Sequence, residues 1–275
     1  MSGSLKPTFI VFGLLGGLLL LNLVLPIINL LLQADWPAWL ASLNQPEARQ
    51  AIKVSSLSSG ISVLVMALLG VPLGYVLARA RLPLKRLWVG LVFLPMVVPD
   101  LAGGILLLQL FGPYGAIGQP LDVRDIELTN NLAGIVLAQL FVAAPFVVVS
   151  ALAAFTAVDP KLEMAAAMLG DSRWQIFWRV SLPLAWPGLA AGITLAWVRA
   201  LGEFGTTLIM AYSPHTLPVH MYMKFESDGL AGALPAAFCL LLLAAAAVAF
   251  CMFLTHLTSF AGAAEPLGDE ARGAA

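Results

Sequence analysis

Charged side chains are scarce in this sequence. Of its 275 residues only 11% are charged and 60% are hydrophobic, whereas a soluble domain carries about a quarter charged residues. The net charge is −1 and the basic residues are scattered, so the electrostatic footprint of a nucleic-acid-binding protein is missing. Composition therefore indicates a protein that lies in a lipid bilayer and has no nucleic-acid partner.

Cysteine and histidine are also few, and their spacing assigns them no chemistry. Cys239 and Cys251 are separated by roughly 18 Å along a helix axis, which is too far for a disulfide. The histidines, which are His215, His220 and His256, form no metal-ligand spacing. No Lys follows a Gly anywhere, so the chain lacks the G-K-[ST] end of a phosphate-binding loop. We expect no metal and no cofactor to be bound by this chain.

Long uncharged stretches are what the sequence does contain. Six of them can cross roughly 30 Å of hydrocarbon. They are residues 8–32, 54–78, 87–112, 131–158, 187–212 and 233–255. The first is too long for a signal-peptide h-region of about 7–15 residues, so we expect it to be retained. The sequence predicts an all-α, polytopic membrane protein with six transmembrane helices.

The distribution of Lys and Arg predicts the orientation of these spans, because basic residues near helix ends stay on the cytoplasmic side. Nine basic residues fall in the tails and in the loops after the second and fourth spans: Lys6, Arg79, Arg81, Lys85, Arg86, Lys161, Arg173, Arg179 and Arg272. Four fall on the opposite side: Arg49, Lys53, Arg124 and Lys224. We therefore expect a cell inner-membrane protein with both termini in the cytoplasm and with outward-facing loops near residues 33–53, 113–130 and 213–232.

The cytoplasmic loop between the fourth and fifth spans has the pattern of two short helices. Asp159 is a good N-cap with Pro160 at the first helical position, and Gly170 suits a left-handed stop. A capping box at residues 172–175, Ser-Arg-Trp-Gln, starts the second helix. We expect that helix to end at Pro183.

This loop resembles the signature of the permeases of binding-protein-dependent ABC importers, which reads Glu-Ala-Ala, three residues, Gly, nine residues, Ile-x-Leu-Pro. The matching positions are Ala165, Ala166, Gly170, Val180, Leu182 and Pro183. Met164 stands at the position of the family's Glu, and an acidic residue, Glu163, comes one position earlier.

The resemblance implies the type I ABC importer permease fold and a coupling helix that docks on a separate nucleotide-binding subunit. That subunit, and not this chain, would bind ATP and Mg and hydrolyse the ATP, so this chain would be a transport subunit and not an enzyme. The coupling residues carried over are Glu163, Met164, Ala165, Ala166, Leu169 and Gly170. Because two ATPase subunits need two docking loops, we also expect a homodimer of the permease.

Residues 70–112 and 199–211 resemble the molybdate, tungstate and sulfate branch of these permeases, in which an Arg is followed by Gly-Glu-Phe/Tyr-Gly. The resemblance implies import of one of these oxyanions, delivered by a periplasmic or extracellular substrate-binding protein. It covers residues 54–258, the expected core permease domain, which follows an N-terminal helix and periplasmic loop (1–53) and precedes a cytoplasmic tail (259–275). Import of ferric iron, thiamine, a polyamine or an amino acid stays open, as do an autonomous channel or secondary transporter and a membrane scaffold.

Three charged residues fall near the middle of the predicted spans. Arg199 and Glu203 are spaced i, i+4 on one predicted helix face, and Asp100 reaches a similar depth in the third span. Charge inside a membrane is costly unless it is paired or hydrated, so we expect these three to form one cluster. The cluster either orders the bundle or, with Gly202, Phe204 and Gly205, lines a pathway or gate. A carboxylate there would repel an oxyanion, which keeps a cation or a neutral substrate open.

Overall fold

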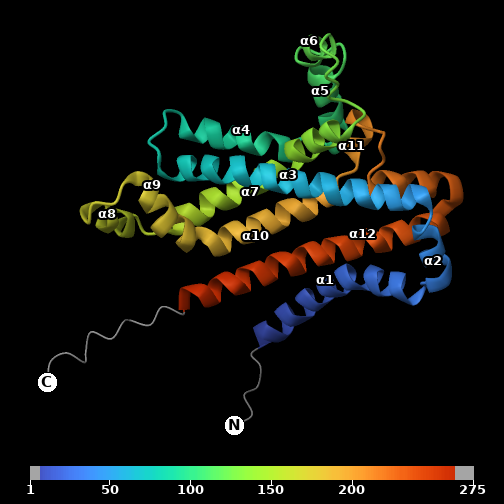
Figure 1. The fold of residues 1–275 in the computed structure, drawn as a ribbon. Coiled ribbons are helices and arrows are strands. Elements are labelled where there is room, and N and C mark those ends of the chain that lie inside the picture. Colours follow the sequence, from blue (N-terminus) through green and yellow to red (C-terminus); the bar gives the residue numbers. More distant parts are fainter. Residues whose placement is uncertain (1–6, 264–275) are drawn as a thin grey trace.

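The computed structural model describes residues 7–263, which form helices and contain no strand. Figure 1 shows most of the long helices side by side in one bundle. The elements are α1 (Pro7–Leu32), α2 (Trp36–Leu43), α3 (Pro46–Arg79), α4 (Lys85–Val97), α5 (Asp100–Phe111), α6 (Gly118–Asp122), α7 (Leu132–Ala157), α8 (Pro160–Met168), α9 (Arg173–Ile176), the π-helical turn η1 (Phe177–Ser181), α10 (Leu182–Leu201), α11 (Gly205–Met210) and α12 (Leu217–Ala263).

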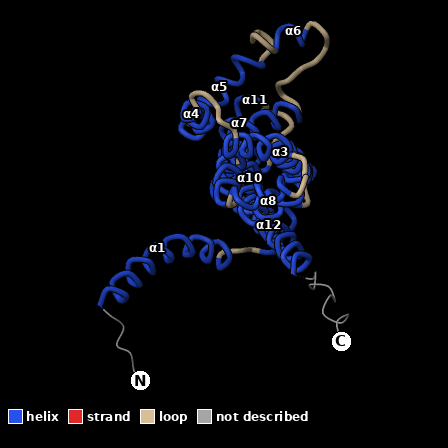
Figure 2. Tube along the Cα trace, turned by 90° about the vertical axis from the view of Figure 1, so that its left-hand side faces the viewer, coloured by secondary structure: helices blue, strands red, loops and turns tan. Residues whose placement is uncertain are grey.

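The core lies between α3, α7 and α10. Its buried side chains include Met66, Val147, Phe155 and Leu189. Small residues let the helices approach closely, and a Cβ atom at Gly74 would overlap the Cβ of Ala151. By contrast, none of the most apolar stretch of α1 is buried within the chain, and Figure 2 shows α1 leaving the bundle.

The prediction of an all-α protein with several membrane spans is confirmed. Five helical segments of the described chain are long and apolar enough to cross a membrane: Val11–Leu32, Pro46–Arg79, Leu132–Ala157, Arg173–Leu201 and Leu217–Phe253. A sixth is obtained when the bent pair α4 and α5 counts as one span.

The third predicted span, residues 87–112, is wrong as a continuous helix. The axes of α4 and α5 differ by 111° across the break at Val98 and Pro99. Pro99 has no N–H to donate, and its ring disfavours the helical conformation at Val98, whose backbone is extended. Figure 1 shows α5 and α6 standing out from the bundle at this break.

The fifth predicted span, residues 187–212, is shifted toward the N-terminus. The helical path begins at Arg173 and passes through η1 into α10, so Pro183 does not end the second loop helix as predicted. In η1 the N–H of Leu182 bonds to the carbonyl of Phe177, five residues back, and this wider turn absorbs the irregularity that Pro183 introduces. The path then ends at Leu201, and residues 202–204 are not helical.

The last predicted span, residues 233–255, lies within the longer α12. Gly229, at a φ of 71°, interrupts the helical backbone inside it. The helix continues to Ala263, into the predicted tail 259–275. The remainder of that tail, residues 264–275, lies outside the described residues.

Candidate functional site

The structure brings the three predicted membrane charges together. Arg199 donates from Nη1 to Oε2 of Glu203 over 2.7 Å and from Nη2 to Oδ1 of Asp100 over 2.8 Å. Charge-assisted bonds of this length are the strong ones. One guanidinium thus bridges two carboxylates from segments about a hundred positions apart in the sequence.

Each member of this charged cluster (Asp100, Arg199 and Glu203) lies at a helix break. Asp100 is the first residue of α5, and Arg199 lies in the last turn of α10. Glu203 lies past the Gly202 cap of α10, so the prediction that Arg199 and Glu203 share one helix is wrong, although their spacing still lets them pair. The cluster therefore joins the α4–α5 break to the α10–α11 break.

The two carboxylates of the charged cluster differ in their surroundings. The Glu203 side chain is fully buried and also accepts a bond from the backbone N–H of Thr206 over 2.7 Å. The Asp100 side chain is 45% exposed. Glu203 is thus held firmly in place, and separating Asp100 from Arg199 costs less free energy than separating Glu203 from it.

Small residues pack α5 against α11 beside the charged cluster. Thr206 donates from its hydroxyl to the Asp100 carbonyl over 2.8 Å. A Cβ atom added at Gly205 would lie 2.9 Å from the Cβ of Asp100, and one at Gly104 would lie 2.7 Å from the Cβ of Ile209. These distances leave no room for a side chain, so α5 and α11 form one tight pair. The ring of Phe204 lies outside this contact, 5.1 Å from that of Tyr222.

Sequence reasoning missed a buried polar network that supports the end of α10. Gln139 accepts a bond from the Ser62 hydroxyl over 2.8 Å and donates to Ser58 and to the Ala200 carbonyl, each over 3.1 Å. Ser55 accepts from the Leu217 N–H, at the start of α12, over 2.7 Å. The sequence signal was present, because serines recur at helical spacing along one face of α3.

The loop between α7 and α10, which we call the coupling loop, has the helix caps and the turn that the sequence predicts, although its second helix continues past Pro183. Asp159 caps α8 by accepting from the N–H of Lys161 over 2.9 Å, and Gly170 takes a φ of 95°, a conformation that favours glycine. The capping box of Ser172 and Gln175 is formed at the start of α9.

One side of α8 and the turn after it presents apolar side chains without cover from the described chain. Met164 is 58% exposed, and Met168 and Leu169 are both 89% exposed. Ala165 is exposed and Ala166 is half-buried beside them. We call Met164, Met168 and Leu169 the apolar face of α8. A docking role for these residues stays a prediction.

Glu163 points away from the apolar face of α8. Its Oε1 accepts from Arg79 Nε over 3.0 Å and from the Ser181 hydroxyl over 2.7 Å. A docking role for Glu163 also stays a prediction, and its hydrogen-bond partners in the described chain are internal.

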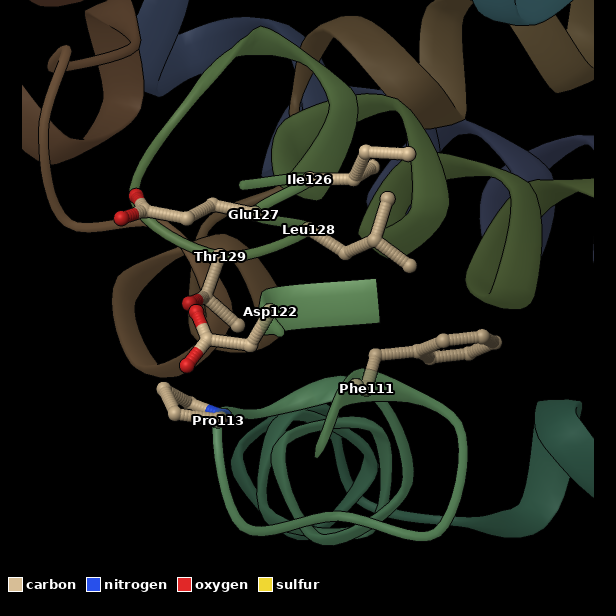
Figure 3. Close-up of a pocket in the computed structure, with 8 residues that line it drawn as sticks. Phe111, Pro113, Asp122, Ile126, Glu127, Leu128 and Thr129 are labelled. Carbon is tan, nitrogen blue, oxygen red and sulfur yellow. The ribbon is translucent and has the colours of Figure 1, made fainter. Parts of the chain in front are cut away.

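A small cavity lies between α5 and the loop that leads to α7. Figure 3 shows Asp122 and Thr129 beside each other there, with Phe111 and Ile126 among the other lining residues. Its volume is about 10 Å³, which holds one water molecule at most. This cavity is therefore too small for an oxyanion.

Comparison with known proteins decides the family. Residues 70–260, more than half of the chain, match the family described as binding-protein-dependent transport system inner membrane component. The chain belongs to this family. The match contains both breaks, the charged cluster and the coupling loop, so these features belong to the family domain of the permease.

Curated relatives cover most of this permease. It is 44% identical over 236 residues, 86% of each chain, to the "Probable molybdenum ABC transporter permease protein" of Haloferax volcanii. It is 38% identical to the molybdate/tungstate transport system permease protein WtpB of Thermococcus kodakarensis, over 84% of this chain and 89% of that one. It is 34% identical to the sulfate transport system permease protein CysT of Escherichia coli, over 70% of each chain.

Solved structures share the fold of this permease. A bacterial ABC transporter that imports the acidic polysaccharide alginate matches with a TM-score of 0.63 at 20% identity, over 92% of this chain and 97% of that one. The MetNI methionine ABC transporter in an inward-facing conformation matches with a TM-score of 0.63 at 16% identity, over 76% and 94%. At such identities the likeness concerns the fold alone.

Proposed function

We propose that this permease carries a small tetrahedral oxyanion, molybdate, tungstate or sulfate, into the cytoplasm. The observation that carries the proposal is the 44% identity, over 86% of both chains, to a relative whose name specifies molybdenum. The named tungstate and sulfate relatives widen the substrate class to oxyanions of similar charge and shape. No relative reported above is named for iron, thiamine, a polyamine or an amino acid.

The partners follow from the same assignment. An ATP-hydrolysing subunit, which would hold the ATP and Mg, docks on the apolar face of α8, with Ala165, Ala166 and Gly170 shaping the contact. Exposed apolar side chains rimmed by polar residues mark such surfaces. A substrate-binding protein delivers the oxyanion at the opposite end of the bundle. A second copy of the permease completes a homodimer, which fits the uncovered apolar surface of α1.

The proposed orientation places α8 and both termini in the cytoplasm of a cell with the permease in its inner membrane. The start of α1 and the end of α12 point toward the end of the bundle that carries α8 and α9 (Figure 1). Lys6 and Arg272, two of the basic residues behind this orientation, lie outside the described residues. The division into residues 1–53, 54–258 and 259–275 is part of the same proposal.

We also propose that the charged cluster, with Gly202, Phe204 and Gly205, forms the gate of the pathway. Its position at two helix breaks supports this role, because non-helical backbone at membrane depth is tolerated only where protein or water covers it. The cluster carries one positive and two negative formal charges. A net negative gate disfavours tight oxyanion binding, which suits a pathway that must release its substrate.

The test is ATP-driven uptake by the full complex of permease, ATPase and binding protein in proteoliposomes. We expect molybdate, tungstate or sulfate on the binding protein to stimulate both ATP hydrolysis and uptake of the labelled oxyanion. The empty binding protein is the control. Stimulation by a cationic or neutral ligand, with none by the three oxyanions, would overturn the substrate class while leaving the family unchanged.

A further inference from the structure

One carboxylate beneath the coupling helix joins segments that are far apart in the sequence. The Oε1 atom of Glu163, on α8, lies 2.9 Å from Arg79 Nη2 and accepts from Arg79 Nε over 3.0 Å. The same oxygen accepts the hydroxyl of Ser181, which lies in η1 and is fully buried, over 2.7 Å. The Arg79 and Glu163 side chains are only 19% and 15% exposed.

Arg79 adds a fourth segment to this junction. Its Nη2 donates to the carbonyl of Val158, the cap residue of α7, over 2.9 Å. The end of α3, the end of α7, the coupling helix α8 and the π-helical turn η1 are therefore tied by Arg79 and Glu163. Figure 1 shows α8 and α9 at the end of the bundle, so this junction lies where the coupling loop meets the spans.

An aromatic cluster lies next to the polar junction. Tyr75 on α3 contacts Phe155 on α7 and Phe177 in η1 at ring-centroid distances of 5.0 and 4.9 Å, and Phe155 and Phe177 are 6.1 Å apart. These three rings come from the three segments that Arg79 and Ser181 join to Glu163. Packed cores shift between discrete arrangements and do not deform continuously, so the same three segments are held to move together.

The orientation of Glu163 separates two tasks of the coupling loop. Docking is available to the apolar face of α8, which the described chain leaves uncovered. Glu163 is held inside the chain and offers little surface to another subunit. A rigid connection between α8 and the spans is a separate requirement. The charge-assisted hydrogen bonds of Glu163, at a mostly buried site, provide such a connection.

We propose that Glu163 is a positioning residue that transmits displacement of α8 through Arg79 to α3 and α7 and through Ser181 to α10, and that it is not a contact of the ATPase. The proposal rests on the proposed function, because it needs an ATPase that moves α8. It replaces the expectation that Glu163, as one of the coupling residues, contacts the ATPase subunit.

The experiment separates docking from coupling in the full complex. Glu163→Ala and Arg79→Ala are compared with Arg81→Ala, a matched arginine control that is exposed and makes no ion pair among the described residues. Met168→Ser, on the apolar face of α8, is the contrasting docking variant. Two quantities are measured: the affinity of the permease for its ATPase subunit and the number of molybdate ions transported per ATP hydrolysed.

We expect Glu163→Ala and Arg79→Ala to keep the wild-type ATPase affinity within about twofold and to transport about tenfold less molybdate per ATP, since loss of one such bond is commonly equivalent to a factor of ten or more. The double variant should be no worse than Glu163→Ala alone, because Glu163→Ala already breaks the links of α8 to both Arg79 and Ser181. Glu163→Gln should recover part of the ratio, because its amide oxygen still accepts from Ser181. Met168→Ser should lower ATPase affinity and leave the ratio of the assembled complex unchanged.

Two results would overturn the proposal. A loss of ATPase affinity above about tenfold in Glu163→Ala would make the residue a docking contact. An unchanged ratio of transport to hydrolysis in both Glu163→Gln and Glu163→Ala would remove its positioning role. If the wild-type complex responds to a ligand other than an oxyanion, only the substrate assignment fails, and the same ratio is measured with that ligand.

Discussion

Arg199 Nη2 lies 2.8 Å from Asp100 Oδ1, and this bond crosses from the end of α10 to the start of α5. Because α5 is packed tightly on α11, the bond also fixes the α5–α11 pair relative to α10. Movement of that pair must first separate Arg199 from Asp100, while the buried bond to Glu203 can persist. The ion pair between Arg199 and the half-exposed Asp100 is thus the one that the proposed gating movement would break.

Neutralising Arg199 alone should cost more than neutralising Arg199 and Glu203 together. We expect Arg199→Gln to lower the free energy of unfolding by about 3–5 kcal/mol, because it leaves Glu203 as an uncompensated buried charge. Glu203→Gln should cost less, because Arg199 keeps its ion pair with Asp100, and the double variant should be milder than Arg199→Gln. Thermal unfolding in detergent measures this cycle. Lys224→Gln, which removes an exposed i, i+4 pair with Asp228, is the control and should change stability by less than about 1 kcal/mol. Strictly additive losses would contradict the pairing.

A methyl group between α5 and α11 should be poorly tolerated. In Gly104→Ala the new Cβ would meet Ile209 at 2.7 Å and the Thr206 carbonyl at 3.0 Å, so we expect a loss of about 1–3 kcal/mol from overpacking. Gly90→Ala is the matched control in α4, where nothing lies within 4 Å. It should be neutral or slightly stabilising, since alanine favours a helix. Equal melting temperatures for the two variants would show that the pair is loosely packed.

The turn after the coupling helix should depend on the backbone of Gly170 and not on its lack of bulk. Its φ of 95° lies where L residues are strained, although an added Cβ would meet nothing within 4 Å. We expect Gly170→Leu to uncouple transport from ATP hydrolysis while the spans stay inserted. Gly170→Asn should retain more coupling, because asparagine tolerates left-handed backbone better. Transport per ATP measures both variants, and equal ratios would contradict this explanation.

Side-specific labelling should reveal the orientation of the loops. In a background with Cys239 and Cys251 replaced by alanine, Arg81→Cys and Asp171→Cys should react with an impermeant thiol reagent only from the cytoplasm. Asp122→Cys should react only from outside. The physical basis is the excess of Lys and Arg on one side. Reaction of all three from the same side is the outcome that the proposed topology does not allow.

Local signals made the coupling loop predictable. Asp159, Ser172 and Gln175 bond to backbone groups two or three residues away, so sequence spacing alone contains their geometry. The depth of Asp100 and Arg199 could likewise be counted from the span ends. Counting along the chain therefore predicts the three members of the charged cluster, which the structure brings together.

Long-range partners were not predictable in this way. Gln139 and Ser58 are 81 positions apart, and Arg79 and Glu163 are 84 positions apart, so no spacing rule connects them. The break at Pro99 was missed because hydropathy stays high through residues 87–112, although the prolines are visible in the sequence. High hydropathy indicates that a segment avoids water, but it does not indicate whether the helix axis of that segment is straight.

The bend between α4 and α5 limits where acyl chains can touch this protein. The 13 residues of α4 rise about 20 Å, short of the roughly 30 Å of hydrocarbon, and the next helix leaves at 111°. Because Pro99 has no N–H, the carbonyl of Pro95, four residues earlier, has no helical donor and cannot be left facing lipid. The annulus of bound lipid must therefore be interrupted on the Asp100 side, where a partner surface or a water-filled vestibule replaces it.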